Sequence, residues 1–269
     1  MTSAWSLLPS ATRAFEVLRR APLRLVAITS LWLFARGSGL FVVASFVPAA
    51  HAAPRPELPG DVFASQPPEV QSALRFVCGS VMLVALWTLA AWADTGFLRA
   101  IRDATREPST ASPRVFLRPG AAFGRMLAYH VASGLLVFVV CLVAVLPGAV
   151  VASIPDDPSD ALATWGTVLA LVPMAAAYVV VHARLLLAPH AVVLEERVVK
   201  DAWRSSFERT RGGSWRLLSF VAVLELVEAV STLGLVVHWF VGFVAVTLAH
   251  AWTALVVMDR WGAMAPGAR

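Results

Sequence analysis

Charged residues are scarce in this sequence. Only 14% of the 269 residues are Asp, Glu, Lys or Arg, whereas 58% are hydrophobic. A water-soluble fold of this size needs more polar side chains to cover its surface, so the scarcity excludes an ordinary soluble domain. The hydrophobic residues form blocks of about 20 residues, the length at which an α-helix crosses a bilayer, and they do not alternate as barrel strands do. The sequence therefore predicts an all-α, polytopic membrane protein.

Cysteines and catalytic motifs are also few. Cys78 and Cys141 are the only cysteines, and both lie inside apolar blocks, which excludes a disulfide framework. The chain has no His-Glu-x-x-His zinc motif, no Gly-x-Ser-x-Gly elbow and no Gly-rich phosphate loop with its Lys. We therefore expect no cofactor and favour a protein without enzymatic activity. A lipid-modifying enzyme is the third of three functional hypotheses.

Six apolar blocks reach the length of a transmembrane helix. They cover residues 25–47, 76–98, 126–151, 162–188, 217–237 and 239–258. We therefore predict one integral membrane domain over residues 1–269, with six transmembrane helices arranged as three hairpins.

The basic residues fix the predicted orientation. The chain has 22 Lys and Arg residues, and all but three lie in one set of segments or at the block ends that adjoin them. These segments are the two termini, the connection between the second and third blocks, and the connection between the fourth and fifth blocks. The exceptions are Arg36, Arg55 and Arg75. Short basic connections stay in the cytoplasm, so both termini are predicted to be cytoplasmic and the 54–68 loop to face outward. We expect a multi-pass protein of the bacterial cytoplasmic (inner) membrane.

The same basic excess gives a net charge of +5 and a pI of about 10.2. In a soluble protein these values would fit a nucleic-acid partner. In a membrane protein they are explained by orientation and by attraction to anionic lipid headgroups. The expected partners are therefore the lipid bilayer with its anionic headgroups and, as a further possibility, another membrane protein, but no nucleic acid.

A short pattern recurs before each odd-numbered block, in which a Phe is followed nine residues later by an Arg. The three copies are Phe15 with Arg24, Phe116 with Arg125 and Phe207 with Arg216. The pattern predicts three repeat units, at about 8–98, 110–188 and 198–260, that form a pseudo-threefold bundle with its axis along the membrane normal. The alternative is that Phe and Arg are simply common where helices enter a membrane.

Amphipathic segments are predicted to precede each hairpin. In the first copy the apolar face is formed by Leu8, Ala11, Phe15 and Leu18, and in the third copy Phe207 lies on such a face. The third-copy face also includes Val199, Trp203 and Thr210. We expect these helices to lie along the inner leaflet, with Phe15 and Phe207 pointing into it.

Polar residues inside the apolar blocks form two candidate clusters. The intramembrane cluster consists of Arg36, Glu225, Glu228 and His250, and the cytoplasmic-side cluster consists of Asp94, His130, His182 and Arg184. A charge in hydrocarbon needs a partner or a wet cavity. The repeat places Arg36 level with Glu228, so we predict an ion pair between them, with Glu225 as the alternative acceptor. Both clusters fit contacts between helices, an ion or proton path, or a substrate pocket; a metal site at Glu225, Glu228 and His250 is a weaker alternative.

One cytoplasmic connection carries a family resemblance. Pro189 follows the fourth block, Ala202 and Ser206 form an Ala-x-x-x-Ser pattern, and Gly213 and Trp215 precede the next block. This order resembles bacterial six-span proteins grouped with the membrane domain of glycerophosphoryl diester phosphodiesterases. In that family the activity belongs to a separate soluble barrel, so the resemblance implies a stand-alone membrane domain without catalytic residues. Pro189 is expected to end the fourth helix, Ala202 and Ser206 to allow close packing, and Gly212-Gly213 to break the helix before the next span.

The sequence therefore favours a non-enzymatic membrane module, acting as a scaffold, a partner subunit or a lipid-envelope factor. The second hypothesis is a transporter or channel that uses the polar interior around Arg36, Glu225 and Glu228. A transporter should show a hydrated cavity at these residues, whereas a scaffold should show them sealed by apolar side chains.

Overall fold

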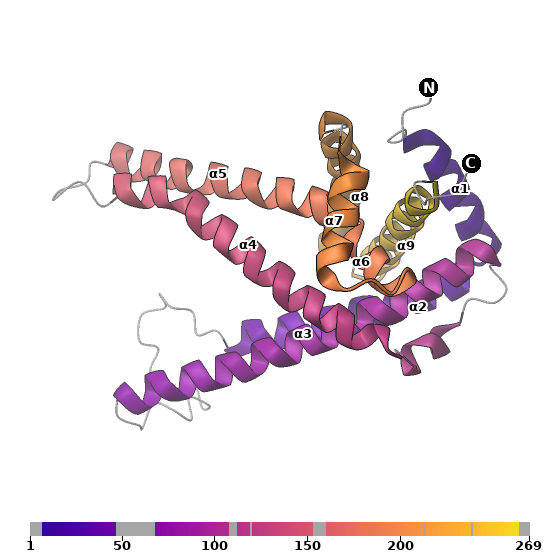
Figure 1. The fold of residues 1–269 in the computed structure, drawn as a ribbon, viewed down its shortest axis with the longest axis horizontal. Helices are drawn as coiled ribbons and strands as arrows, with labels where there is room; N and C mark the ends of the chain where they lie inside the picture. The colour runs from indigo at the N-terminus through magenta and orange to yellow at the C-terminus, as the bar shows by residue number, and fades with distance from the viewer. Residues whose placement is uncertain are drawn as a thin grey trace.

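The computed structural model describes residues 7–46, 68–107, 112–118, 120–152, 160–211, 214–237 and 239–263, which are helical apart from short turns, with no strand among them. Figure 1 shows the order of the helices along the chain. They are α1 (Leu7–Arg20), α2 (Pro22–Phe46), α3 (Pro68–Arg106), the 3₁₀ helix η1 (Pro113–Leu117), α4 (Ala122–Ala152), α5 (Asp160–Leu185), α6 (Ala188–Leu194), α7 (Val199–Thr210), α8 (Ser214–Val237) and α9 (Trp239–Ala263).

The six long helices, α2, α3, α4, α5, α8 and α9, coincide with the six predicted apolar blocks. Within the described part of the chain, four helical stretches are long and apolar enough to cross a membrane: Gly79–Arg106, Ala122–Val151, Trp165–Leu194 and Val241–Gly262. The largest boundary difference is in α3, which continues eight residues past the predicted end at residue 98. Hydropathy falls there because of charged residues, but Ala100, Ile101 and Ala104 keep a buried face at helical spacing.

The core lies where the ends of the long helices meet α1, η1, α6 and α7, and we call this region the hub. Its largest fully buried side chains include Leu25, Ile28, Ile101, Phe116, Met126, Leu187, Leu217 and Leu255. Because α3 contributes only its second half, residues 91–104, to this core, the same helix is buried at one end and exposed at the other.

The outer parts of α4 and α5, residues 135–151 and 165–180, extend away from the hub as a hairpin (Figure 1), and we call this hairpin the arm. The two helices pack on each other, and at Gly148 a Cβ would lie 2.4 Å from the backbone nitrogen of Ala170. Glycine therefore permits the close approach of the two helices. Only 6% and 11% of the most apolar windows of these helices are buried inside the protein. The arm thus presents an apolar surface that the described part of the chain leaves largely uncovered.

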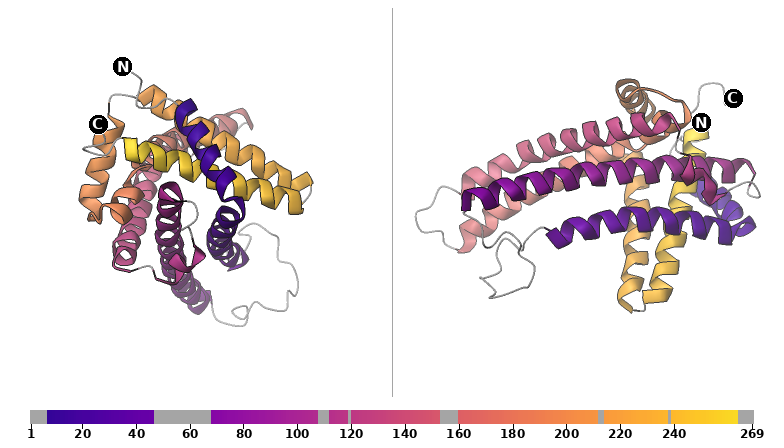
Figure 2. Two further views of the ribbon diagram at one scale, coloured as in Figure 1. Left: turned by 90° about the vertical axis from the view of Figure 1, so that its right-hand side faces the viewer. Right: turned by 90° about the horizontal axis from the view of Figure 1, so that it is seen from below.

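The structure does not confirm the pseudo-threefold bundle. In Figure 2 the α8–α9 hairpin runs across the direction of α2 and α3 instead of alongside them. The repeated Arg residues do lie in corresponding places, since Arg24, Arg125 and Arg216 stand in the first turns of α2, α4 and α8. The repeated Phe residues do not: Phe116 is buried, whereas Phe15 and its third-copy counterpart are exposed. The sequence pattern therefore marks helix entrances more clearly than a structural repeat.

Helix α7 packs on the protein through its small residues. Ala202 and Ser206 are fully buried, which confirms the close-packing face expected from the Ala-x-x-x-Ser pattern. Phe207 is exposed beside them. Pro189 lies in the first turn of α6, after α5 has already ended at Leu185. Proline is tolerated in a first turn, where its missing N–H is not needed. The predicted break at residues 212–213 falls beyond the described residues.

Helix α1 contacts α9 through a face other than its apolar face, which we predicted to point into the inner leaflet. Ser10 and Ala14 are buried in this contact, whereas Leu8 and Phe15 are exposed. Small side chains allow α1 to approach α9 closely, and the larger apolar side chains are left free to contact another apolar phase.

Candidate functional site

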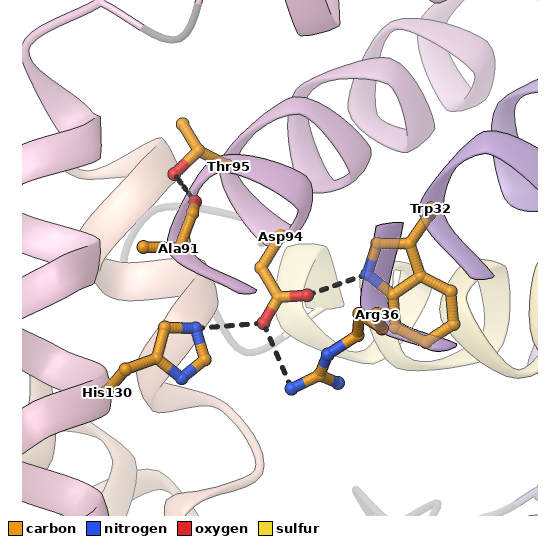
Figure 3. A network of polar contacts seen from close by, with 6 residues as sticks. All are labelled: Trp32, Arg36, Ala91, Asp94, Thr95 and His130. Carbon is orange, nitrogen blue, oxygen red and sulfur yellow. Dashed lines mark hydrogen bonds and ion pairs between the residues drawn. The ribbon is translucent and has the colours of Figure 1, made fainter. Parts of the chain in front are cut away.

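A network of polar contacts surrounds the carboxylate of Asp94, in the part of α3 where the hub begins (Figure 3). Trp32 donates a hydrogen bond from Nε1 to Oδ1 of Asp94 at 2.6 Å. His130 Nε2 lies 3.0 Å from the second carboxylate oxygen, and an Arg36 guanidinium nitrogen lies 3.6 Å from the same atom. The Asp94 side chain is 15% exposed, so these three groups replace most of the water that would otherwise solvate it.

Three helices bring these residues together. Trp32 and Arg36 are four residues apart on α2, so they share a face, and the Arg36 guanidinium carbon lies 5.4 Å from the Trp32 ring centroid. The Trp32 ring also stacks on the Phe97 ring, with the ring centroids 4.8 Å apart. It makes an edge-to-face contact with the His250 ring, with the centroids 5.3 Å apart. The network therefore joins α2, α3 and α4 directly and reaches α9 through an aromatic contact.

The structure groups the predicted site residues differently from the two predicted clusters. Arg36 approaches Asp94, which was assigned to the other cluster, and His250 lies beside the same network. Glu225, the predicted alternative acceptor for Arg36, instead lies 3.6 Å from His182. The side chain of Glu228 lies outside the described residues, so its predicted pairing with Arg36 stays a prediction. The prediction compared only the depths of residues along their spans. In the structure, α2 packs mainly against α3 and α9.

The His182–Glu225 contact joins α5 to α8. Tyr178 stacks on the His182 ring, with centroids 5.8 Å apart and the planes nearly parallel. All three side chains are exposed, and the Glu225 side chain is 62% exposed. This group is therefore open on its outer side, in contrast to the Asp94 network.

Hydrogen bonds of Arg184 connect the end of α5 to α7. Its guanidinium donates to the Thr210 carbonyl oxygen at 2.6 Å, and the Ser206 hydroxyl donates to the Arg184 carbonyl oxygen at 2.6 Å. Since the last carbonyls of a helix lack partners within the helix, this exchange satisfies one of them and fixes α7 at the same time. Arg184 thus serves to connect two helices.

Two further charged contacts in the hub were not found from the sequence. The Arg209 guanidinium carbon lies 3.7 Å from the Trp261 ring centroid, and its NH2 lies 2.8 Å from Glu195. Near α1, Asp259 accepts a hydrogen bond from Ser10 at 2.5 Å and pairs with Arg13 at 3.0 Å. Both contacts join residues far apart in the chain. The one sequence feature that points to these contacts is the position of Asp259 and Trp261 just after an apolar run.

The described contacts of these groups connect helices. Within the described residues, no three His, Cys, Asp or Glu side chains stand close enough to hold a metal ion. A cleft of about 670 Å³ lies between α1, α3 and α9, lined by Arg13, Glu16, Arg20, Thr105 and Asp259 among others. A smaller cleft of about 430 Å³ lies on α7 and the residues before it. The Asp94 network lines neither of them.

No protein-family model, curated protein or solved structure matches this chain.

Proposed function

We propose that this protein is a non-enzymatic, multi-pass module of the bacterial inner membrane that works as a scaffold or partner subunit. In this proposal α2 and α8 also cross the bilayer, which gives six spans, and the hub and both termini lie on the cytoplasmic side. The observation that carries the proposal is the contrast between a hub packed inside the protein and an arm whose apolar windows are only 6% and 11% buried. An uncovered apolar surface of this kind needs lipid or another membrane protein around it.

The Asp94 network supports a scaffold because it joins helices: Trp32 of α2 and His130 of α4 contact its carboxylate, which is 15% exposed. The side chains of Arg36 and Glu225 are 42% and 62% exposed, so they are not sealed as the scaffold hypothesis expected. Polar groups that satisfy one another fix the register of neighbouring helices, which is the ordinary use of such contacts in membranes.

Exposed residues of α1 support contact with anionic lipid. Leu8 and Phe15 are exposed together with Arg19 and Arg20 on the same short helix, and Leu23 follows them. Large apolar side chains beside Arg residues fit a helix lying in the headgroup region, where each nearby basic residue contributes about 1 kcal/mol of attraction to anionic lipid. In the proposal this basic helix lies at the cytoplasmic leaflet, together with the hub.

The resemblance of the 184–218 region to the membrane domain of glycerophosphoryl diester phosphodiesterases adds to the proposal. Its expected packing face at Ala202 and Ser206 is buried in the structure.

Single-cysteine labelling in intact cells tests the proposal, after Cys78 and Cys141 are replaced by Ala. A membrane-impermeant maleimide should label Ser65→Cys from outside, whereas Lys200→Cys, exposed on α7, should react only after permeabilisation. Labelling of the Lys200 position in intact cells, with protection at position 65, would reverse the topology and remove the proposal.

Transport is the second candidate function, and one observation favours it: the carboxylate of Glu225 and the imidazole of His182 are exposed between two apolar helices. Titratable groups in such places form proton paths in some membrane proteins. Purified protein in vesicles should then dissipate a pH gradient, and Glu225→Gln should abolish this flux. A gradient as stable as in empty vesicles would dismiss the candidate.

A further inference from the structure

The α5–α8 face, which we define by Tyr178, His182 and Glu225, combines a carboxylate with an exposed aromatic ring. Glu225 stands near the middle of α8. Leu226 and Val230 are exposed farther round the same helix. On α5 the exposed Tyr178 continues the surface across the His182–Glu225 contact. Among the side chains that the structure describes on this face, Glu225 is the acidic one.

The carboxylates of Asp94 and Glu225 differ in their exposure and in their contacts. Asp94 is 15% exposed and has a Trp, a His and an Arg around it. Glu225 is 62% exposed, and its described contact is with His182 at 3.6 Å, which carries a charge only when protonated. A carboxylate surrounded by hydrocarbon needs donors or an opposite charge, so the described contacts leave Glu225 under-satisfied in a membrane.

We infer that the α5–α8 face binds a transmembrane helix of another protein, and that this helix carries a Lys or Arg at the level of Glu225. Charge complementarity decides the chemistry, since a basic side chain would neutralise Glu225 while the Tyr178 ring packs against the rest of the helix. The inference deepens the proposed function, on which it rests, by assigning the partner's site.

A second copy of the chain fits this face less well. Copies in one membrane share their orientation, so a twofold contact would bring two Glu225 carboxylates to the same depth. Neither copy offers a permanently charged cation on the described part of the face. Like charges at close range oppose association, and a basic partner removes that conflict.

Synthetic membrane helices test the inference with the full-length protein. Two peptides of about 20 leucines, one with a central Lys and one with Leu at that position, span a bilayer alike. Each is reconstituted with the labelled protein in phosphatidylcholine vesicles, and binding is followed by energy transfer. The Lys peptide should bind about tenfold more tightly than the Leu peptide, the scale of one polar contact between membrane helices.

Two isosteric variants make the comparison specific. Glu225→Gln should remove the preference for the Lys peptide. Glu208→Gln should keep it, because Glu208 is also 62% exposed but lies on α7 and pairs with Arg204. Equal binding of both peptides to the wild-type protein would overturn the inference, as would a preference that survives Glu225→Gln. Energy transfer between two labelled copies that depends on Glu225 would assign the face to self-association and overturn it as well. The cysteine labelling pattern reports separately on the proposed function, so a lost Lys preference with the predicted topology intact rejects the partner site alone.

Discussion

The hub and the arm are built from similar apolar residues but use them in opposite ways. Leu217 in the hub is buried to 1% exposure, whereas Leu142 in the arm is half exposed. In the hub, charged side chains meet partners from other helices, as Arg209 does with Glu195. In the arm, α4 and α5 contact mainly each other. The difference shows that apolar side chains are buried against other parts of the protein in the hub, whereas in the arm they are exposed to the surroundings of the protein.

Matched leucine truncations should show the largest difference between the two regions. Leu217→Ala removes a fully buried side chain from the hub and should lower the free energy of unfolding by about 3 kcal/mol. Leu142→Ala should lower it by less than about 0.5 kcal/mol, because an exposed side chain leaves no cavity. Unfolding in detergent micelles, followed by circular dichroism, measures both values. Equal losses would mean that the arm is packed against protein as tightly as the hub.

Removing the central carboxylate of the hub network should have the next largest effect. Asp94→Ala leaves Arg36 and His130 without their acceptor and should cost about 2 to 3 kcal/mol, toward the lower end of the range for breaking a buried pair because Arg36 is partly exposed. The double variant Asp94→Leu with Arg36→Leu should recover part of that loss. Thermal unfolding of the single and double variants gives the comparison, and a double variant no more stable than Asp94→Ala contradicts it.

Replacing two glycines of α3 compares the packing of its hub end with that of its outer end. A Cβ at Gly96 would lie 2.6 Å from Cδ1 of the buried Phe116, so Gly96→Val should cost about 2 kcal/mol by overpacking. Nothing lies within 4 Å of a Cβ at Gly79, so Gly79→Val should be close to neutral. The same unfolding measurement applies, and a destabilised Gly79→Val would reveal a contact on the outer part of α3.

The smallest expected difference in stability is between variants of two arginines on α7. The Arg209 side chain is 9% exposed and contacts both Trp261 and Glu195, so Arg209→Ala should cost about 1 to 2 kcal/mol. Arg204 is 78% exposed and pairs with Glu208 one turn away, and its replacement by Ala should change stability by less than about 0.5 kcal/mol. Comparable losses for the two variants would contradict the assignment of Arg209 to the hub.

The sequence predicted the long helices well because crossing a bilayer demands an apolar run of fixed length, and such runs are visible without any knowledge of neighbours. It placed Asp94 and His130 in one group, and the structure brings them to 3.0 Å. It did not foresee Arg36 beside Asp94, because position along a span gives depth but not the direction in which a side chain points. It also missed Arg209 on Trp261, since that contact forms only when α7 folds back onto α9.

Helix α3 contains 39 residues without an internal proline, a length of about 58 Å, which exceeds the roughly 30 Å of bilayer hydrocarbon. One end of this rod carries Asp94 and the other carries the exposed Val77 and Val81. Because an unbroken helix has no hinge, a change of tilt at the outer end is also a change of tilt at Asp94. Membrane thickness acts on helix tilt. If α3 crosses the bilayer as we propose, a change in membrane thickness that tilts this helix also moves Asp94 relative to its partners on α2 and α4.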